Sequence, residues 1–229
     1  AYCAHPEATA ELIQAWGIPV VMGNCEESLG GDADDCGCGF GDDTTCSVLS
    51  VGWYRYAQRH ISEATRRWMR ALPRSVEFCL GEHRFVVVHG SVSRINQFIF
   101  PSSPESAKHA ELTRVDADVV IGGHSGIPFG QRIGSRAWLN AGAIGMPAND
   151  GTQDGWYMTL MPEGEGVTAR WHRLRYAALD ESTAMRTHGL SAAYADALLD
   201  GRWPSLDVLP AAEQEQTAVA LAPPPLHLG

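Results

Sequence analysis

The chain has 229 residues, of which 45% are hydrophobic and 19% charged, and its formal net charge at pH 7 is −10. This is an ordinary globular composition and a length sufficient for one domain with its own core. No apolar run reaches about 18 residues, so no membrane-spanning helix is predicted, and the negative charge argues against a nucleic-acid partner.

The first third of the chain predicts helix, strand, long loop and helix, in that order. Apolar residues at helical spacing predict a helix over residues 5–16, and a short β-branched run predicts a buried strand over residues 18–22. Residues 28–45 are rich in Gly and Asp and lack periodicity, which indicates a long loop of the kind that is usually functional or disordered. Ser62 is the expected N-cap of a helix through Leu72.

Four arginines fall on that last predicted helix or just beyond it, at positions 66, 67, 70 and 74. A run of like charges on a helix usually forms a solvated face. We therefore expect these arginines to face solvent.

Short strands dominate the next part of the chain. A hairpin is predicted over residues 76–80 and 84–88, and a helix over residues 105–114. Further strands are expected at 118–121, 131–133, 136–140, 156–160 and 167–174. A helical region follows over 177–199, with a break near Gly189. One domain should span residues 1–208, and the Ala-, Gln- and Pro-rich residues 209–229 should form a flexible tail.

Three predicted strands each end in a polar side chain that can bind a metal ion: Asn24, His89 and His124. Ligands gather beyond the carboxyl ends of strands in α/β folds, and rigid strands can aim several side chains at one point. Any one of these residues alone would more often be a hydrogen-bonded structural residue. Together, each beside a glycine, they predict one metal site.

These residues lie in segments that resemble the motifs of the calcineurin-like metallophosphoesterases, in particular those of the small bacterial and archaeal branch. The family motifs are Gly-Asn-His-Asp/Glu, His-Gly, Gly-His-Thr-His and Asn-Pro-Gly-Ser-Val-Gly-x-Pro. Their counterparts here are Gly23-Asn24-Cys25-Glu26, His89-Gly90, Gly123-His124-Ser125-Gly126 and residues 140–147. Order and spacing agree across roughly residues 1–174.

The resemblance implies an α/β fold in which two mixed β-sheets pack face to face with helices outside. It also implies hydrolysis of a phosphoester bond at a dinuclear metal centre. Asn24, His89 and His124 would hold one ion, and Asn24, Cys25 and Glu26 would occupy the catalytic positions. Nitrogen and oxygen ligands suit Mn, Fe, Zn, Co or Ni. The expected substrate is a small phosphorylated molecule or a phosphoprotein, with neither nucleic acid nor membrane as a partner.

The sequence departs from the family pattern at three places. The early Asp-x-His and Gly-Asp motifs are absent, so we expect these 229 residues to be the C-terminal part of a longer protein. Cys25 stands where the family has a histidine near the leaving group, and Gly126 replaces the second histidine of Gly-His-Thr-His. His172 or His60 could replace that ligand only if the fold brings one of them near.

A cysteine-rich loop follows the first motif, with Cys36, Cys38 and Cys46 close to Cys25. No secretory signal is visible, so a cytoplasmic location with free, reduced cysteines is the expectation. A structural zinc site and a redox pair are the alternatives. Two other functions stay open beside the hydrolase: a catalytically weakened relative that binds a metal or a partner, and a redox-responsive protein.

Overall fold

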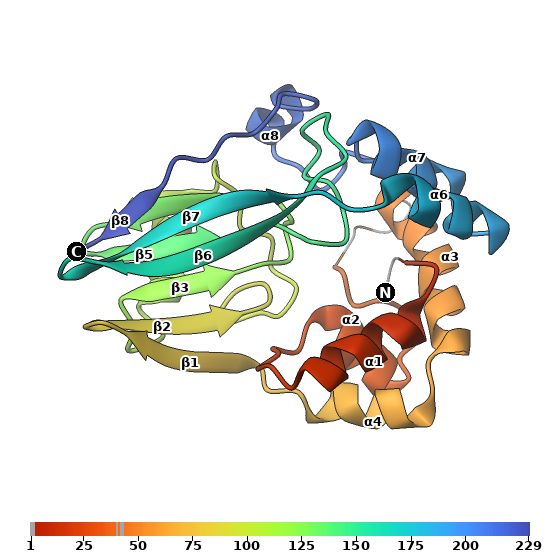
Figure 1. Cartoon of the computed structure of the whole chain (residues 1–229), viewed down its shortest axis with the longest axis horizontal. Helices are drawn as coiled ribbons and strands as arrows, with labels where there is room; N and C mark the ends of the chain where they lie inside the picture. The colour runs from red at the N-terminus through yellow and green to blue at the C-terminus, as the bar shows by residue number, and fades with distance from the viewer. Residues whose placement is uncertain (1–2, 40, 42–43) are drawn as a thin grey trace.

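The computed structural model describes residues 3–39, 41 and 44–229, which form two β-sheets and a group of helices (Figure 1). The strands are β1 (Ser75–Leu80), β2 (His83–Val88), β3 (Val119–Gly122), β4 (Phe129–Ile133), β5 (Arg136–Asn140), β6 (Gly155–Glu163), β7 (Gly166–Leu174) and β8 (Leu226–Leu228). The helices are α1 (Pro6–Trp16), α2 (Asn24–Gly31), α3 (Thr45–His60), α4 (Glu63–Ala71), α5 (Glu105–Leu112), α6 (Ala178–Thr187), α7 (Ala192–Asp200) and α8 (Ala211–Glu215).

The larger sheet has five strands in the order β1-β2-β3-β5-β4. Strands β2, β3 and β5 run parallel, whereas β1 and β4 are antiparallel hairpin partners at the two edges. All four residues of β3 are buried, as expected for a central strand with a continuous apolar sequence. The parallel arrangement brings the carboxyl ends of β2, β3 and β5 to the same edge of the sheet.

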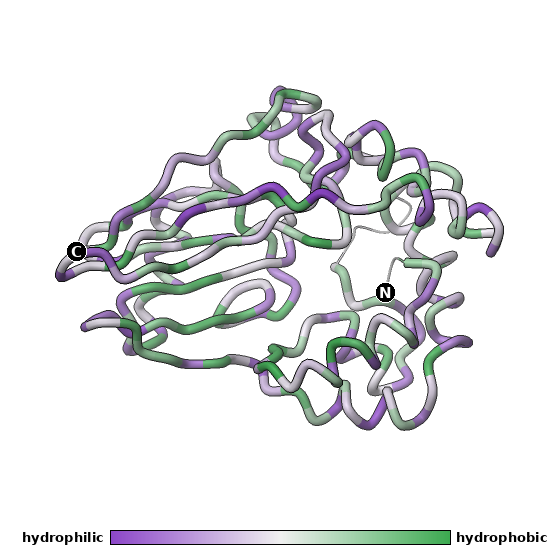
Figure 2. Tube along the Cα trace, in the orientation of Figure 1, coloured by the Kyte–Doolittle hydropathy of each residue, from purple (hydrophilic) through white to green (hydrophobic). Residues whose placement is uncertain are grey.

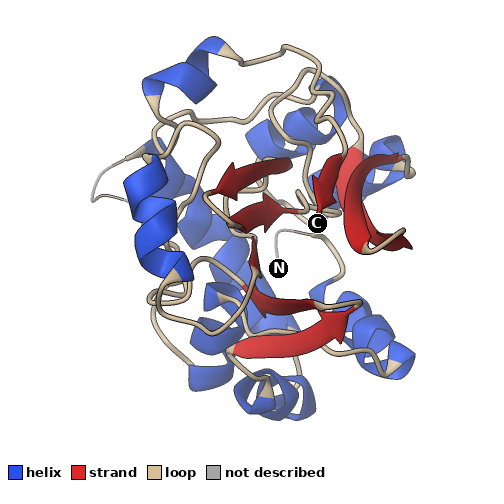
Figure 3. Cartoon of the chain, turned by 90° about the vertical axis from the view of Figure 1, so that its left-hand side faces the viewer, coloured by secondary structure: helices blue, strands red, loops and turns tan. Residues whose placement is uncertain are grey.

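The smaller sheet has three antiparallel strands in the order β6-β7-β8. It packs against the larger sheet through a shared core that includes Phe85, Val119, Leu139, Val167 and Ala169 (Figure 3). The predicted α/β fold of two facing sheets with helices is therefore confirmed. The smaller sheet differs from the expectation in being antiparallel throughout its described strands.

The helices occupy two places relative to these sheets. Leu112 of α5 joins a second core with Val86 and Trp138 on the outer face of the larger sheet. Helices α1–α4, α6 and α7 gather beside the sheets rather than over them, around a separate core that includes Trp53 and Tyr54 (Figure 1). Figure 2 shows hydrophobic stretches along β2 and β3, where both faces of the sheet are covered. No described helix is long and apolar enough to cross a membrane.

The predicted strand over residues 18–22 is wrong, because this segment joins neither of the described sheets. It runs extended beside α4 and donates one backbone hydrogen bond, from Met22 N–H to the carbonyl of Pro73 at 2.7 Å. Ile18 is 52% exposed. A β-branched sequence favours a strand only where a neighbouring strand supplies the hydrogen-bond ladder.

The predicted loop over residues 28–45 is shorter than expected. Helix α2 takes its beginning, and α3 begins at Thr45, where the Thr44 side chain accepts a hydrogen bond from Ser47 N–H at 3.2 Å. Residues 40, 42 and 43 of this loop, like residues 1 and 2, lie outside the described part of the chain. The sequence analysis did not predict α3, which carries β-branched and aromatic residues with weak helix propensity.

Residues 209–229 pack on the domain instead of forming the predicted flexible tail. β8 pairs with β7, and Glu213 of α8 accepts hydrogen bonds from the backbone N–H and the hydroxyl of Ser102. Arg173 donates to the carbonyl of Leu221 at 2.7 Å. Composition alone missed these contacts because each of them is made with a residue far away in the sequence.

Two of the four arginines expected on a solvated face instead hold the carboxyl end of α2. Arg66 donates to the carbonyl of Leu29 at 2.8 Å and also bonds the carbonyl of Gln58, while Arg70 bonds the carbonyl of Gly30. Cationic side chains at a helix C-terminus satisfy carbonyls that have no partner within the helix. Helix α4 thereby fixes α2, the helix whose first residue is Asn24.

Replacing Arg66 by Lys should lower the free energy of unfolding by about 1–3 kcal/mol, because an ammonium group cannot reach both carbonyls as the planar guanidinium does. Urea denaturation followed by circular dichroism measures this. The matched control is Arg67→Lys, since Arg67 is 64% exposed and lies 3.9 Å from its partner Glu63. That variant should change stability by less than about 0.5 kcal/mol. Equal losses for the two variants would contradict the role given to Arg66.

Candidate functional site

Three side chains named by the sequence analysis meet where the larger sheet abuts the helices. Asn24 is the first residue of α2, His89 directly follows β2, and His124 lies two residues beyond β3. Asn24 is only 2% exposed. The fold thus brings Asn24, His89 and His124 together from three separate elements.

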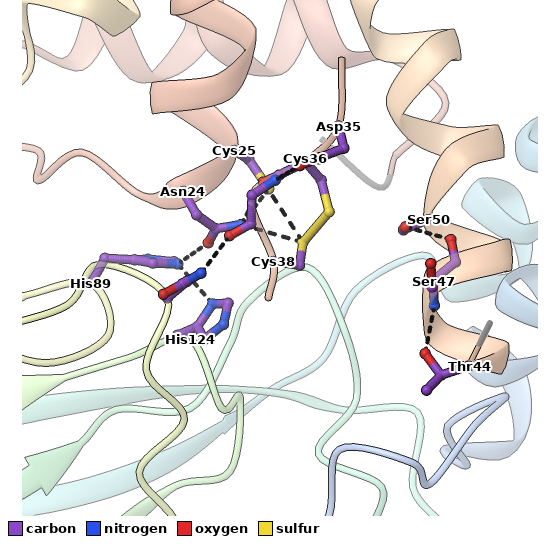
Figure 4. Close-up of a disulfide and its surroundings, with 12 residues drawn as sticks. Asn24, Cys25, Asp35, Cys36, Cys38, Thr44, Ser47, Ser50, His89 and His124 are labelled. Atoms are coloured by element: carbon purple, nitrogen blue, oxygen red, sulfur yellow. Dashed lines mark hydrogen bonds between the residues drawn. A yellow bond between two sulfur atoms is a disulfide. The ribbon is translucent and has the colours of Figure 1, made fainter. Parts of the chain in front are cut away.

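The polar atoms of these residues face one another (Figure 4). His89 Nε2 lies 2.8 Å from Asn24 Oδ1 and 3.1 Å from His124 Nδ1. A single ring N–H can satisfy only one of these contacts well, and His124 Nε2 is buried without a hydrogen-bond partner. The Asn24 oxygen and the ring nitrogens of His89 and His124 therefore bring more acceptor lone pairs together than the available N–H donors can satisfy.

Glycines beside these residues allow the close approach. A Cβ on Gly23 would lie 2.6 Å from Glu26 Oε2 and 3.0 Å from His89 Nδ1, and one on Gly123 would lie 3.0 Å from the carbonyl oxygen of His89. Gly123 N–H also donates to that carbonyl at 2.6 Å. A side chain on Gly123 would push the two histidine-bearing loops apart, and one on Gly23 would displace Glu26 and the ring of His89.

His124 has a positive φ of 60°, a backbone region that favours glycine. The N–H of Ser125 donates to the carbonyl of Gly123 at 2.6 Å, which closes a tight turn around His124. Phe98 packs on the His124 ring, with ring centroids 4.1 Å apart. The surrounding structure therefore holds His124 in a conformation that the isolated chain disfavours.

Asn140, at the end of β5, braces the same turn. It is fully buried, and its Nδ2 donates to the carbonyl of Gly123 at 3.1 Å and to Ser125 Oγ at 2.9 Å. Its Oδ1 accepts the N–H of Gly142 at 2.9 Å. The sequence analysis noted Asn140 only within a motif and missed this positioning role, as it also missed Phe98.

Burial lowers the pKa of both histidines. The pKa of His124 falls to about 3, first because of burial and then because of the nearby His89. Burial likewise lowers the pKa of His89, opposed by the negative charge of Glu26. Both rings are thus neutral at pH 7, the form that binds a metal ion.

Cys25 and Glu26 lie next to these residues in the first turn of α2. Burial raises the pKa of the Cys25 thiol to about 12, and the charge of Glu26 adds to the effect. Cys25 is therefore a protonated thiol at neutral pH and packs against the apolar core of the helices. Glu26 accepts the N–H of Gly23 at 2.9 Å and so caps α2.

Cys36 and Cys38 form a disulfide, whereas Cys25 and Cys46 are free. The expectation of free, reduced cysteines is thus wrong for this pair, and the bond removes both sulfurs from a structural zinc site. The disulfide lies against Asn24, whose Nδ2 donates to the carbonyl of Cys36 at 2.8 Å and to Cys38 Sγ at 3.3 Å (Figure 4).

No other candidate ligand joins this site within the described residues. Gly126, which stands where the family has a second histidine, has a φ of 67°, and a Cβ there would lie 3.6 Å from the indole of Trp203. His172 Nε2 is paired with Thr159 at 2.8 Å, and His60 is stacked on Tyr56. Within residues 3–39, 41 and 44–229, no group of three or more His, Cys, Asp and Glu residues has the geometry to hold a metal ion.

The trio of Asn24, His89 and His124 nevertheless fits one divalent ion. Two ligands about 2.1 Å from one ion are about 3.0–3.4 Å apart for octahedral or tetrahedral angles. The observed separations of 2.8 and 3.1 Å are close to this range. A cation would also satisfy lone pairs that now face one another.

Comparison with known proteins finds a matching family profile and solved structures of similar fold. The profile of the calcineurin-like phosphoesterase superfamily domain matches residues 3–163. A metallophosphoesterase from Sphaerobacter thermophilus is 19% identical, with a TM-score of 0.68 over 88% of this chain and 84% of that one. A hypothetical protein from Pyrococcus horikoshii is 16% identical, with a TM-score of 0.72 over 88% and 82%. No protein of curated function matches the sequence.

Replacing Asn140 by Ala should lower the free energy of unfolding by about 2–3 kcal/mol, because it leaves buried polar groups of the His124 turn without partners. Chemical denaturation measures the loss. The exposed Gln153 provides the control, and Gln153→Ala should change stability by less than about 0.5 kcal/mol. A loss below 1 kcal/mol for Asn140→Ala would show that the turn does not depend on this amide.

The low pKa of His124 predicts how stability of the metal-free protein depends on pH. Between about pH 3 and 6.5 the unfolded chain binds a proton at residue 124 that the folded chain does not. The free energy of unfolding is therefore unaffected by this residue above pH 6.5 and decreases as the pH falls below it. Urea unfolding with a chelator, from pH 7.5 to 5, measures the slope. His124→Asn should flatten it by up to about 1.4 kcal/mol per pH unit, whereas His109→Asn, on the exposed side of α5, should not. An unchanged slope for His124→Asn would refute the assignment.

Proposed function

Because the chain belongs to the calcineurin-like phosphoesterase superfamily, we propose that it hydrolyses a phosphoester bond with a divalent metal ion held by Asn24, His89 and His124. The position of His89 Nε2, 2.8 Å from Asn24 Oδ1 and 3.1 Å from His124 Nδ1, supports this proposal most directly. The family uses divalent metals, and Mn, Fe, Zn, Co and Ni all suit such ligands.

A bound divalent ion would lower the pKa of a water molecule and offset charge on the phosphoryl oxygens. Residues of the chain are already arranged to bind such an ion. Neutral His89 and His124 present lone pairs without the cost of losing a proton, and the bonds to Cys36 and Cys38 turn the Asn24 oxygen toward His89. Asn140 and Phe98 hold the His124 turn, so little reorganisation is needed when the ion binds.

The surroundings of His89 favour a small phosphorylated substrate. A cavity of about 360 Å³ has His89 in its wall, although Asn24 and His124 do not line it. Arg94 also lines this cavity, as does Arg74, which is ion-paired with Glu27. Arginine binds phosphate or carboxylate groups through paired hydrogen bonds. A phosphoprotein would have to present a protruding side chain, and a nucleic acid would meet a chain of net charge −10.

The second candidate is a relative that binds a metal ion or a partner without efficient hydrolysis. Two observations favour it. Cys25, with a pKa of about 12, is a poor proton donor to a leaving alkoxide, and Gly126 provides no second histidine for another ion. Both candidates use the same metal site, but only the first would hydrolyse a substrate efficiently.

Hydrolysis of an aryl phosphate with added Mn²⁺ distinguishes them. If the chain is a hydrolase, Asn24→Ala and His89→Ala should each lower Mn²⁺-dependent kcat/KM by about 100-fold or more. The exposed His109 of α5 supplies the control, and His109→Ala should leave the activity unchanged.

Calorimetric titration with Mn²⁺, done in parallel, separates loss of metal from loss of chemistry. Mn²⁺ binding that depends on Asn24 and His89, with no hydrolysis of mono- or diester substrates, would establish the second candidate. Hydrolysis that survives both substitutions would refute the proposed site.

A further inference from the structure

The cysteine loop contacts the proposed metal site through one side chain, Asn24. The amide nitrogen of Asn24 donates to the carbonyl of Cys36 and to the sulfur of Cys38, so that its oxygen is turned toward His89 (Figure 4). An amide has one oxygen and one nitrogen, and rotation by 180° would replace the metal-facing oxygen with an N–H group. The partners of the nitrogen thus decide whether Asn24 can act as a ligand.

The disulfide itself contributes little as a staple. Its two cysteines are separated by a single residue, and the loop that a disulfide closes determines how much chain entropy it removes from the unfolded state. Its local effect is larger, because it fixes the spacing of two of the three acceptors that hold the Asn24 amide. The third acceptor is Cys25 Sγ, at 3.6 Å. Asn96 supports the same segment by donating to the carbonyl of Gly37 at 3.0 Å.

We propose that the Cys36–Cys38 disulfide is redox-active and that its state sets the metal affinity of the site formed by Asn24, His89 and His124. This inference rests on the proposed function. A dithiol such as dithiothreitol reduces the bridge by thiol–disulfide exchange. The dithiol loses two electrons and two protons and closes its own disulfide, while the Cys36–Cys38 bond breaks and both sulfurs become thiols.

Reduction removes the constraint on Asn24. Two thiol sulfurs cannot stay at bonding distance, so the side chains of Cys36 and Cys38 must separate, and the Cys38 sulfur that accepts from Asn24 Nδ2 moves with them. Both cysteines are buried, at 4% and 2% exposure, but they belong to a surface loop in which Asp34 and Asp35 are exposed. The bridge can therefore be reached when the loop opens, and equilibrium measurements do not depend on how fast this occurs.

Thermodynamic reciprocity gives two linked readouts, which must agree in magnitude. Partners that orient a metal ligand typically change metal affinity by 10- to 100-fold, so the reduced protein should bind Mn²⁺ at least about 10-fold more weakly. The same coupling requires Mn²⁺ to stabilise the oxidised form. A 10-fold difference in affinity corresponds to a midpoint potential about 30 mV more negative with saturating Mn²⁺.

Cys3 and Cys79 are also free, and Cys79 is exposed, so the experiment uses a Cys3→Ser/Cys79→Ser background that removes these two thiols. Cys25 and Cys46 are retained, and alkylation is assigned to each cysteine separately. The protein is equilibrated with mixtures of reduced and oxidised dithiothreitol, with and without Mn²⁺, and its thiols are counted by alkylation and mass spectrometry. Calorimetry then gives the Mn²⁺ affinity of the oxidised and the reduced protein. Mn²⁺ is chosen because it does not favour thiol ligands.

Two variants test the route through Asn24. Asn24→Asp keeps an oxygen ligand and removes the N–H donor, so its Mn²⁺ affinity should be the same in both redox states. Cys36→Ser/Cys38→Ser should show one affinity, close to that of the reduced protein.

Equal Mn²⁺ affinity of the oxidised and reduced forms would overturn the inference while leaving the metal site intact. Failure of Cys36 and Cys38 to form a disulfide with oxidised dithiothreitol would also overturn it. A protein that binds no Mn²⁺ in either state would remove the proposed function and the inference together.

Discussion

The structure of the site depends on the side chain of Asn24, because it is bonded to two parts of the fold at once. Its oxygen contacts His89 at the edge of the larger sheet, and its nitrogen bonds the cysteine loop. Asn24 also begins α2, whose other end is held by Arg66 and Arg70 of α4. The helices beside the sheets therefore act as a support that presents the Asn24 amide to His89, which in turn contacts His124.

The spacing of the two histidines follows from strand register. Val87 of β2 lies beside Ile121 of β3, so His89 and Gly123, each two residues further on, face each other across the strand ends. The bond from Gly123 N–H to the carbonyl of His89 continues this pairing beyond the strands. A slip of one residue would turn one histidine to the opposite face of the sheet. The buried apolar faces of β2 and β3 exclude such a slip, so the core determines the site geometry.

The sequence predicted the elements whose local residue pattern is sufficient to identify them. Apolar strands such as β3 are readable from composition, and the polar residues after β2 and β3 could be expected to meet because parallel strands share an edge. Features that depend on distant partners were missed or wrong. Residues 18–22 have strand composition but pair with neither of the described sheets, residues 209–229 are held by side chains far away in sequence, and the Cys36–Cys38 bond cannot be read from spacing. Asn140 could be read as part of a motif, but its role required knowing where the His124 turn lies.

The positive φ of His124 has an evolutionary consequence. Glycine or asparagine would tolerate this backbone angle better, so substitution at position 124 offers a lineage an easy gain in stability. Most proteins lie close to the stability threshold, and drift would accept such a gain wherever the imidazole is not needed. A histidine is expected to persist at this angle where the ring itself is under selection, as the proposed metal site requires. Relatives that have abandoned the chemistry should be recognisable by a small or αL-tolerant residue at this one position.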